Sequence, residues 1–597
     1  MCGIAGIVDF EGRSRRQQVE EMLKAVGHRG PDGWGVEASK GVTLGHVRLS
    51  ILDLTDRAAQ PMVRGGNTIT YNGEIYNYIE LRNELRSLGH RFVSDSDTEV
   101  VLAAYEEWGP ACVHRFEGMW AFAIHDGSAM EVFCSRDRFG MKPFLYERST
   151  RAFVFGSEPC QFRTQGRGFY PDMTSVYDFL VFGSSLRSER TFLADVRNLP
   201  PGHNLTVELT TGRIRVQRYY LVAESSEFSG LTAEEYGEVL RVEFVRSTRR
   251  HLRSDVRVGV LLSGGVDSSL VASVAAPLYR EASGGDLMAF TATSGDSRND
   301  EAGYARKVAA AAGIEWVPIP VSSSVTADRW REATRVIQQP LADSSHVMQL
   351  EVMRGARNHG CTVLLDGQGA DESWMGYERY AVVASRDVPL RDFPAFARGS
   401  ARNMGMSVPR WAAMWGYFSW STLSATRARW RLRKLGLELD ADWFDSAFRR
   451  VNLSGHGRTD VQQAELQGAQ LGGLLRYADL TSMSLSLEDR LPFLDMRLVE
   501  LAISIPTKLL FRDGWTKYPL RKFLELLAPA AIAWRRRKIG FEAPRTSFRL
   551  SDSEVMATMS QSLVLKDLGI DVSTLASIPT VMAWRLYAIA LWESVSV

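Results

Sequence analysis

Short apolar runs separated by turn residues fill the first third of the chain, and this pattern predicts a domain of mixed strands and helices. The runs end at Gly, Pro, Asn or Asp, as strands joined by tight turns do. Three further segments have apolar residues at helical spacing, and Asp97 is the predicted cap of the third. The predicted strands are Ile4–Phe10, Val42–Ile51, Thr68–Tyr71, Met119–His125, Glu131–Ser135 and Ala152–Gly156; the predicted helices are Arg16–Val26, Tyr78–Leu88 and Thr98–Trp108.

The pattern changes after the turn residues Leu199–Gly202 and the polar stretch Glu224–Gly230. Helices and apolar strands then alternate, which is the rhythm of a parallel sheet. From about Ser385 onward the chain is mainly helical. We therefore predict an α+β sandwich in residues 1–215 and an α/β parallel-sheet domain with a large helical C-terminal part in residues 216–597. The alternating elements are Thr232–Leu252, Val258–Leu262, Ser268–Ala276, Ala289–Thr293 and Val363–Leu365.

Composition restricts the class of protein but does not indicate which reaction it catalyses. Of 597 residues, 45% are hydrophobic and 24% charged, as in ordinary globular proteins, and the net charge of +1 favours neither a nucleic acid nor a membrane surface as partner. The five cysteines are scattered, which argues against disulfides and a zinc site. With no apolar stretch long enough for a membrane helix and no signal-peptide pattern at the start, we predict a cytoplasmic protein.

Cys2 is the first candidate for catalysis. A small residue at position 2 allows removal of the initiator Met, which leaves a cysteine with a free α-amine. Such an amine has an ordinary pKa of about 7.7–8.0, so it can accept the thiol proton near neutral pH. A thiol and a base in one residue form an activated nucleophile.

Polar groups suited to hydrolysis of an amino-acid amide follow Cys2 at predicted strand ends and loops. An Asn side chain beside a Gly amide suits an oxyanion hole, because both donate to the developing negative charge. The planar guanidinium of an Arg side chain can donate two parallel hydrogen bonds to a carboxylate. The blocks are His28–Gly33, Arg48–Ile51, Asn72–Asn77 and Ser96–Glu99.

A second candidate site begins where a predicted strand runs into a helix, at Leu261–Ser269. Its small residues let backbone N–H groups approach phosphates, which the helix N-terminus also favours. Asp267 fits a Mg²⁺ ligand better than a bare phosphate cradle. The loop lacks the GK[ST] ending of a Walker motif.

The first set of blocks resembles the N-terminal domain of class II glutamine amidotransferases, especially those of the asparagine synthetase type. The matching segments are MCGIAG, HRGPDG, RLSI, NGEIYN and SDTEV, in the family's order. The resemblance implies an N-terminal-nucleophile hydrolase fold, an αββα sandwich. It implies that Cys2 is the nucleophile, that Asn72 and Gly73 form the oxyanion hole, that Arg48 with Leu49 and Ile51 holds the glutamine carboxylate end, and that Glu74 and Asp97 hold its ammonium.

The second loop resembles the pyrophosphate loop of ATP pyrophosphatases, and later blocks resemble asparagine synthetases. These blocks are Asp366–Glu372, Glu488–Asp495, Lys517–Arg521 and Arg537–Phe541. The resemblance implies Mg²⁺ on Asp267 and Asp371, and charge stabilisation by Lys538. The implied ATP contacts are Leu262, Ser263, Gly264, Gly265, Asp267, Ser268, Ser269, Ala292, Asp366 and Gly367.

The combination implies a glutamine-dependent ligase that cleaves ATP to AMP and pyrophosphate and converts a carboxylate to an amide, as in the synthesis of L-asparagine from L-aspartate. Ammonia would cross an internal passage between the two domains, and a homodimer is a family expectation. Gln368 departs from this family, which generally has Glu in that place. An amide cannot act as a carboxylate base, so we hypothesise that Asp366 partly replaces it.

Other acceptors and other classes of protein stay open at this point. The helical section of about Ser385–Gly468 is similar to that of longer amidotransferases, which act on cell-surface sugar acids, cell-wall peptides or malonyl and polyketide starter units. A glutamine-independent ligase of the β-lactam synthetase or lasso-peptide cyclase type would not need Cys2. An amidotransferase acting on phosphoribosyl or sugar-phosphate substrates would not need the Ser263–Ser269 loop. A non-catalytic scaffold would need neither group of reactive residues.

Overall fold

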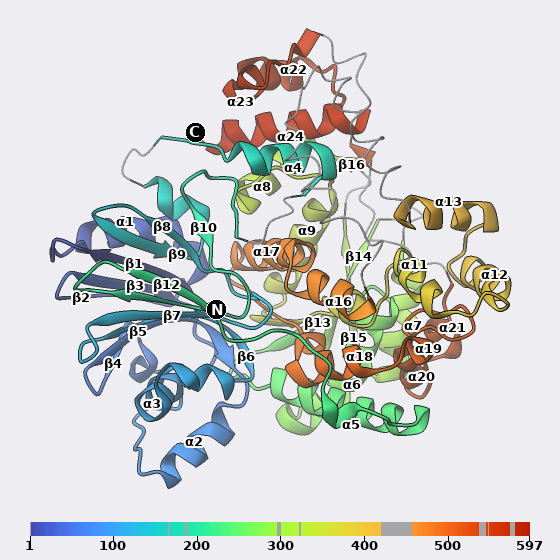
Figure 1. Cartoon of the computed structure of the whole chain (residues 1–597), viewed down its shortest axis with the longest axis horizontal. Coiled ribbons are helices and arrows are strands. Elements are labelled where there is room, and N and C mark those ends of the chain that lie inside the picture. Colours follow the sequence, from blue (N-terminus) through green and yellow to red (C-terminus); the bar gives the residue numbers. More distant parts are fainter. Residues whose placement is uncertain are drawn as a thin grey trace.

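The computed structural model describes residues 2–164, 168–184, 189–294, 300–321, 324–419, 457–536, 545–546, 548–573 and 580–596. Figure 1 shows a strand-rich N-terminal part on the left, in blue to teal, against a larger helix-rich part on the right and at the top. Among the described helices, none has the length and apolar character that a membrane crossing needs.

The N-terminal part is a sandwich of two antiparallel sheets of six strands each, in the orders β10-β8-β9-β1-β3-β2 and β12-β11-β7-β6-β5-β4. Helix α1 packs on the outer face of the first sheet, and α2 and α3 pack on that of the second. This confirms the predicted αββα sandwich. The central bounds are β1 Gly3–Asp9, β3 Val42–Arg48, β5 Asn67–Ile75, β6 Gly118–Asp126, β7 Glu131–Arg136, β9 Ala152–Gly156, α1 Arg16–Ala25, α2 Tyr78–Ser87 and α3 Asp97–Trp108; the edge strands are β2 Gly33–Ser39, β4 Met62–Arg64, β8 Leu145–Arg148, β10 Arg197–Asn198, β11 His203–Glu208 and β12 Ile214–Arg218.

Two details of the sandwich correct the sequence-based expectations. The cap of α3 is Ser96, whose side chain accepts a hydrogen bond from the Thr98 amide, and not Asp97. Asp97 is instead turned into the protein, where it accepts bonds from β5. Strand β3 ends at Arg48, before the predicted Ile51, because the chain turns there and the Ser50 amide bonds to Asp32.

The larger part is built on a parallel sheet of order β15-β14-β13-β17-β18, as the alternating pattern predicted. Helices α5, α6 and α7 pack on one face and α9 on the other. Strand β18 (Glu488–Arg490) was not predicted, because its three residues are charged although all are buried. The other bounds are β13 Val258–Leu261, β14 Met288–Thr293, β15 Glu315–Pro320, β17 Val363–Leu365, α5 Ala233–His251, α6 Val266–Ser283, α7 Ala302–Ala312, α9 Ser345–Asn358 and α17 Ala469–Met483.

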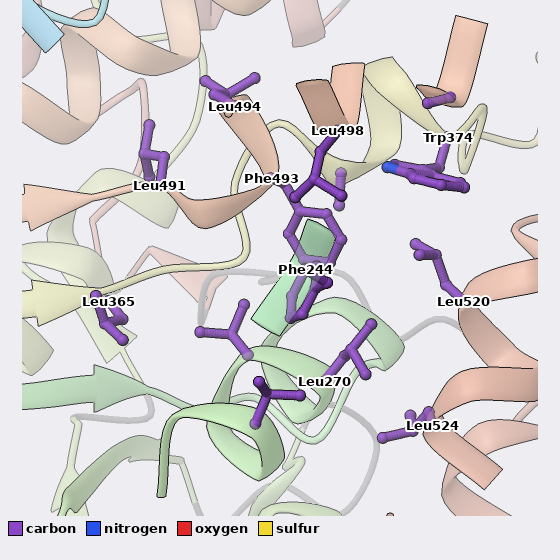
Figure 2. Packing of buried hydrophobic residues seen from close by; sticks show 14 of the residues in the cluster. Phe244, Leu270, Leu365, Trp374, Leu491, Phe493, Leu494, Leu498, Leu520 and Leu524 are labelled. Carbon is purple, nitrogen blue, oxygen red and sulfur yellow. The ribbon is translucent and has the colours of Figure 1, made fainter. Parts of the chain in front are cut away.

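A hydrophobic cluster packs α6, the helix that begins in the candidate phosphate-binding loop, against α5 and α20 (Tyr518–Glu525; Figure 2). The Phe244 ring of α5 lies 4.9 Å from that of Phe493, between centroids. Leu270 of α6 and Leu520 and Leu524 of α20 are completely buried in the same cluster. The packing therefore fixes α6 and α20 relative to each other.

The two parts share their cores. Leu49 and Ile51 of the sandwich belong to the same buried cluster as the parallel-sheet domain. At the other end of the chain, α24 (Thr580–Ser596) packs against α4 (Met173–Phe182) of the N-terminal part. Residues 420–456 of the predicted helical section lie outside the described residues; its described helices are α12 Phe393–Asn403, α13 Val408–Ser419 and α16 Arg458–Leu466.

Candidate active sites

Cys2 lies immediately before β1, between Leu49, which follows β3, and Asn72 of β5. Its backbone nitrogen donates to Asn72 Oδ1 at 3.1 Å, and its sulfur lies 3.9 Å from the Leu49 carbonyl oxygen. Burial raises the pKa of the Cys2 thiol. A thiol with a raised pKa is mostly protonated near neutral pH, so nucleophilic attack requires a base.

Asn72 and Gly73 have the features that an oxyanion hole requires. Asn72 is completely buried, and its Nδ2 group has no hydrogen-bond partner among the described residues. A buried donor without a partner is costly, unless it serves a ligand. Gly73 admits no side chain, since a Cβ atom there would lie 2.2 Å from the Met119 carbonyl oxygen.

Buried carboxyl groups gather along β5, the strand that contains Asn72. Asp97 Oδ2 accepts from the Tyr71 hydroxyl at 2.8 Å and from the Ile75 amide at 2.9 Å. Burial raises the pKa of Asp97 to about 6, and burial together with Glu488 and Asp97 holds the pKa of Glu74 well above its usual range. The buried Arg490 guanidinium lies 2.5 Å from Glu488 and 3.7 Å from Glu74 and offsets part of the repulsion between these charges. An incoming ammonium would relieve the remainder.

Arg48 is held by its own loop. Its Nη1 donates to the Thr55 carbonyl at 2.8 Å and its Nη2 to that of Asp53. The charge of Arg48 also acts on the Cys2 thiol and lowers its pKa, against the larger effect of burial. The structure thus brings Cys2, Arg48, Leu49, Asn72 and the two acidic residues together.

The second site is a cavity of about 1020 Å³ at the carboxyl ends of the parallel strands, where ligands of open α/β sheets bind. Gly264 and Ser269 belong to the loop but are not part of the cavity wall, and Lys538 lies outside the described residues. The predicted residues that line it are Leu262, Ser263, Gly265, Asp267, Ser268, Ala292, Asp366, Gly367, Gln368 and Asp371.

Two glycines allow close packing around this cavity. Gly264 has a φ of +73°, and a Cβ atom there would lie 2.6 Å from Tyr304 of α7. A Cβ atom on Gly367 would lie 2.9 Å from the Ser268 backbone nitrogen. The loop after β13 is also tied internally, since the Ser263 amide donates to Ser268 Oγ at 3.2 Å. The resulting backbone at the start of α6 suits phosphate oxygens.

Asp267 and Asp371 converge on one point. The ammonium of Lys517 lies there, with Nζ 2.7 Å from Asp267 Oδ2 and 2.6 Å from Asp371 Oδ1. Two carboxylates that can share one cation are a donor set that fits Mg²⁺. Sequence reasoning placed Lys517 in a basic block but gave it no role, because only the fold shows which acids it meets.

Comparison with known proteins agrees with both sites. Residues 1–220 match the model of the glutamine amidotransferase domain, and residues 239–568, more than half of the chain, match that of asparagine synthase. The chain belongs to the asparagine synthase family. It is therefore a glutamine-dependent amidotransferase and ligase, and its family uses ATP.

Relatives in this family are similar over almost the full length. Glutamine-hydrolysing asparagine synthetase 1 of Bacillus subtilis is 30% identical over 573 residues, covering 91% of this chain and 87% of its own. A putative asparagine synthetase of Mycobacterium bovis is 31% identical over 590 residues, covering 91% and 88%. Amidase chry2 of Gibberella zeae is 26% identical over 580 residues, covering 86% and 84%.

A buried arginine links the thiol site of this family member to its larger part. Arg29 is completely buried; its Nε donates to the Cys2 carbonyl at 3.0 Å, its Nη1 to Glu158 at 2.8 Å and its Nη2 to Asp479 of α17 at 2.9 Å. Lys142 Nζ lies 3.6 Å from the other oxygen of Asp479. The sequence could not reveal this network, because Arg29 and Asp479 are 450 positions apart.

Proposed function

We propose that this protein makes L-asparagine from L-aspartate, with glutamine as the nitrogen donor and ATP cleaved to AMP and pyrophosphate. The observation that supports the proposal is that one chain contains two candidate sites. One is the Cys2 thiol near the buried, unpartnered Asn72 amide donor, and the other is an ATP-sized cavity lined by Asp267 and Asp371. The named bacterial relatives over nine-tenths of the chain support aspartate as the acceptor. We assign the two half-reactions to residues 1–215 and 216–597.

In the first half-reaction, Cys2 Sγ attacks the glutamine side-chain amide. The Cys2 nitrogen, which is the α-amine after removal of Met1, takes the thiol proton and passes it to the leaving ammonia. The Asn72 Nδ2 group and the Gly73 amide stabilise the oxyanion. Water then hydrolyses the γ-glutamyl thioester to glutamate. Arg48 holds the glutamine carboxylate, with Leu49 and Ile51 beside it, and Glu74 and Asp97 hold the ammonium.

In the second half-reaction, an acceptor carboxylate oxygen attacks the α-phosphorus of ATP and pyrophosphate leaves. The loop of Ser263–Ser269 holds the phosphates, with Leu262 and Ala292 on the adenine side. Asp267 and Asp371 would hold Mg²⁺, which neutralises phosphate charge when bound. Lys538 would stabilise the departing pyrophosphate.

Ammonia then attacks the acyl-adenylate carbon, AMP leaves, and a base must take one proton from the nitrogen. Gln368 lines the cavity but cannot be that base. Asp366 lines the same cavity, and burial raises its pKa to about 6, so it is anionic at neutral pH yet basic enough to accept a proton. Asp366→Ala should slow amide formation by about 10²–10⁴-fold, far more than it slows aspartate-dependent ATP–pyrophosphate exchange, and adding Gln368→Glu should restore part of the rate of amide formation. Full synthetase activity in Asp366→Ala would exclude this role.

The experiment that tests the acceptor is pyrophosphate release from Mg-ATP and glutamine, with and without L-aspartate, coupled to amino-acid analysis. With aspartate present, we expect pyrophosphate, glutamate and asparagine in equal amounts; without aspartate, we expect neither pyrophosphate nor asparagine. Glutamine hydrolysis without aspartate-dependent pyrophosphate would show that the enzyme amidates a different carboxylate.

A further inference from the structure

Lys517 lies where a metal ion shared by Asp267 and Asp371 would lie. Its Nζ is 2.8 and 2.7 Å from the two oxygens of Asp267 and 2.6 Å from Asp371 Oδ1. Lys517 is 4% exposed as a whole residue, and it reaches both acids from a third segment of the chain. Contacts of this length with both acids place the ammonium in the position of a coordinated cation.

The fold holds Lys517 in this position from three sides. Its backbone is left-handed, with a φ of +53°, an uncommon conformation for a residue other than glycine. It caps α20, which Leu520 and Leu524 anchor in the same cluster as α6, the helix of Asp267 (Figure 2). Gly376 leaves room for the side chain, since a Cβ atom there would lie 1.9 Å from both Lys517 Cε and Asp371 Oδ1.

This ammonium competes with a metal ion for the same oxygens. Mg²⁺ dehydrates reluctantly and is usually bound through one or two carboxylates together with substrate phosphates. Without a nucleotide, a divalent ion would have to displace an almost fully buried ammonium from both of its carboxylate partners, at the cost of an unpaired charge. With a nucleotide, phosphate oxygens would supply both the missing metal ligands and a new partner for Lys517.

We propose that Lys517 closes the Asp267–Asp371 site to free divalent metal and gives it up only to a metal–nucleotide complex. The metal then enters with ATP and not before it, and Lys517 moves from the carboxylates to the phosphates. This inference rests on the proposed ATP site, but not on the identity of the acceptor.

The test is a titration of the full-length protein with Mn²⁺, in which electron paramagnetic resonance monitors binding. Neither glutamine nor an acceptor is present. Without nucleotide, Lys517→Met should bind Mn²⁺ at one site per chain, at least about tenfold more tightly than the wild type binds Mn²⁺ at these carboxylates. The double variant Lys517→Met/Asp371→Asn should lose it. Lys508→Met, which removes an exposed lysine, should behave like the wild type. With α,β-methylene-ATP present, the wild type should bind Mn²⁺.

Two results would overturn the proposal: a wild-type site as tight as that of Lys517→Met without nucleotide, or no gain in a Lys517→Met protein whose thermal unfolding shows that it is folded. If the Mn²⁺ site gained in Lys517→Met persists in Lys517→Met/Asp371→Asn, the site lies elsewhere, and this result would also overturn the proposal. Because the titration contains no acceptor, a failure to make asparagine would leave this result unaffected.

Discussion

Asn72 shows at the residue scale how this fold prepares for chemistry. Its Oδ1 atom positions the Cys2 nitrogen, while its Nδ2 group is buried without a partner among the described residues. Neighbouring Asp97 and Glu74 are kept in surroundings that raise the pKa of both. In the proposed function, the buried Asn72 Nδ2 group would gain its missing partner from the substrate.

Asn72→Ala should lower kcat for glutamine hydrolysis by about 10²–10³-fold, the usual effect of losing one oxyanion donor. Because Asn72 is in the sandwich, amide synthesis from added ammonia should be retained. Steady-state assays with glutamine and with ammonium chloride would measure both. An equal loss in the two assays would mean that the substitution acts through folding.

Glutamine hydrolysis should weaken in acid. Asp97 must be anionic to hold an ammonium, and burial raises its pKa to about 6. As the pH falls below that value, Asp97 takes up a proton and kcat/KM for glutamine should fall up to about tenfold per pH unit. Measurements between about pH 5 and 8, with Asp97→Asn as the variant that lacks this inflection, would test this. A flat profile down to pH 5 would contradict it.

At the scale of elements, the strand-to-loop turns position the ATP site. The loop after β17 lies directly on the loop after β13, with Gly367 at the contact. Alternation of apolar runs predicted β13, β14 and β17, because buried parallel strands are apolar throughout. The same signal missed β18, because its residues are charged; Glu488 and Arg490 are nevertheless buried, and they pair with each other at 2.5 Å.

Gly367→Ala should weaken ATP use, because the added Cβ atom would lie 2.9 Å from the Ser268 backbone and push the loops apart. A displacement of about 1 Å at such a site can lower the rate by about 100-fold. ATP–pyrophosphate exchange would measure the loss, and glutamine hydrolysis should persist. Gly303→Ala in α7, where a Cβ atom meets no heavy atom within 4 Å, is the matched control. Unchanged exchange in Gly367→Ala would contradict the assigned contact.

At the scale of the whole molecule, buried ion pairs join the two parts. Asp479→Asn should leave Arg29 and Lys142 without their shared carboxylate, and breaking a buried pair in this way costs about 3–5 kcal/mol. Chemical unfolding should show this loss, and the ratio of glutamate to amide product should rise above one as the sites uncouple. Glu281→Gln, in an exposed pair with Arg249, should leave stability nearly unchanged. Normal stability and coupling in Asp479→Asn would refute the role of this pair.

The sequence indicated candidate residues for chemistry wherever they stand in short blocks. Cys2, Asn72 and Asp267 each sit in such a block, and the fold brings each together with its predicted neighbours. The role of Lys517 and the Arg29–Asp479 pair could not be predicted, because each joins segments far apart in the chain. Local patterns record which groups a segment offers, and only tertiary packing decides which groups meet.

The most direct test of the central claim, that one chain hydrolyses glutamine and delivers its nitrogen to aspartate, is isotope transfer. The enzyme is incubated with Mg-ATP, L-aspartate, glutamine labelled with ¹⁵N in its amide and an excess of unlabelled ammonium, and the asparagine is examined by mass spectrometry. We predict that most asparagine carries ¹⁵N, and that a Cys2→Ala variant makes only unlabelled asparagine. Asparagine from the intact enzyme that is labelled no more than the free ammonium, or the absence of asparagine, would contradict the account.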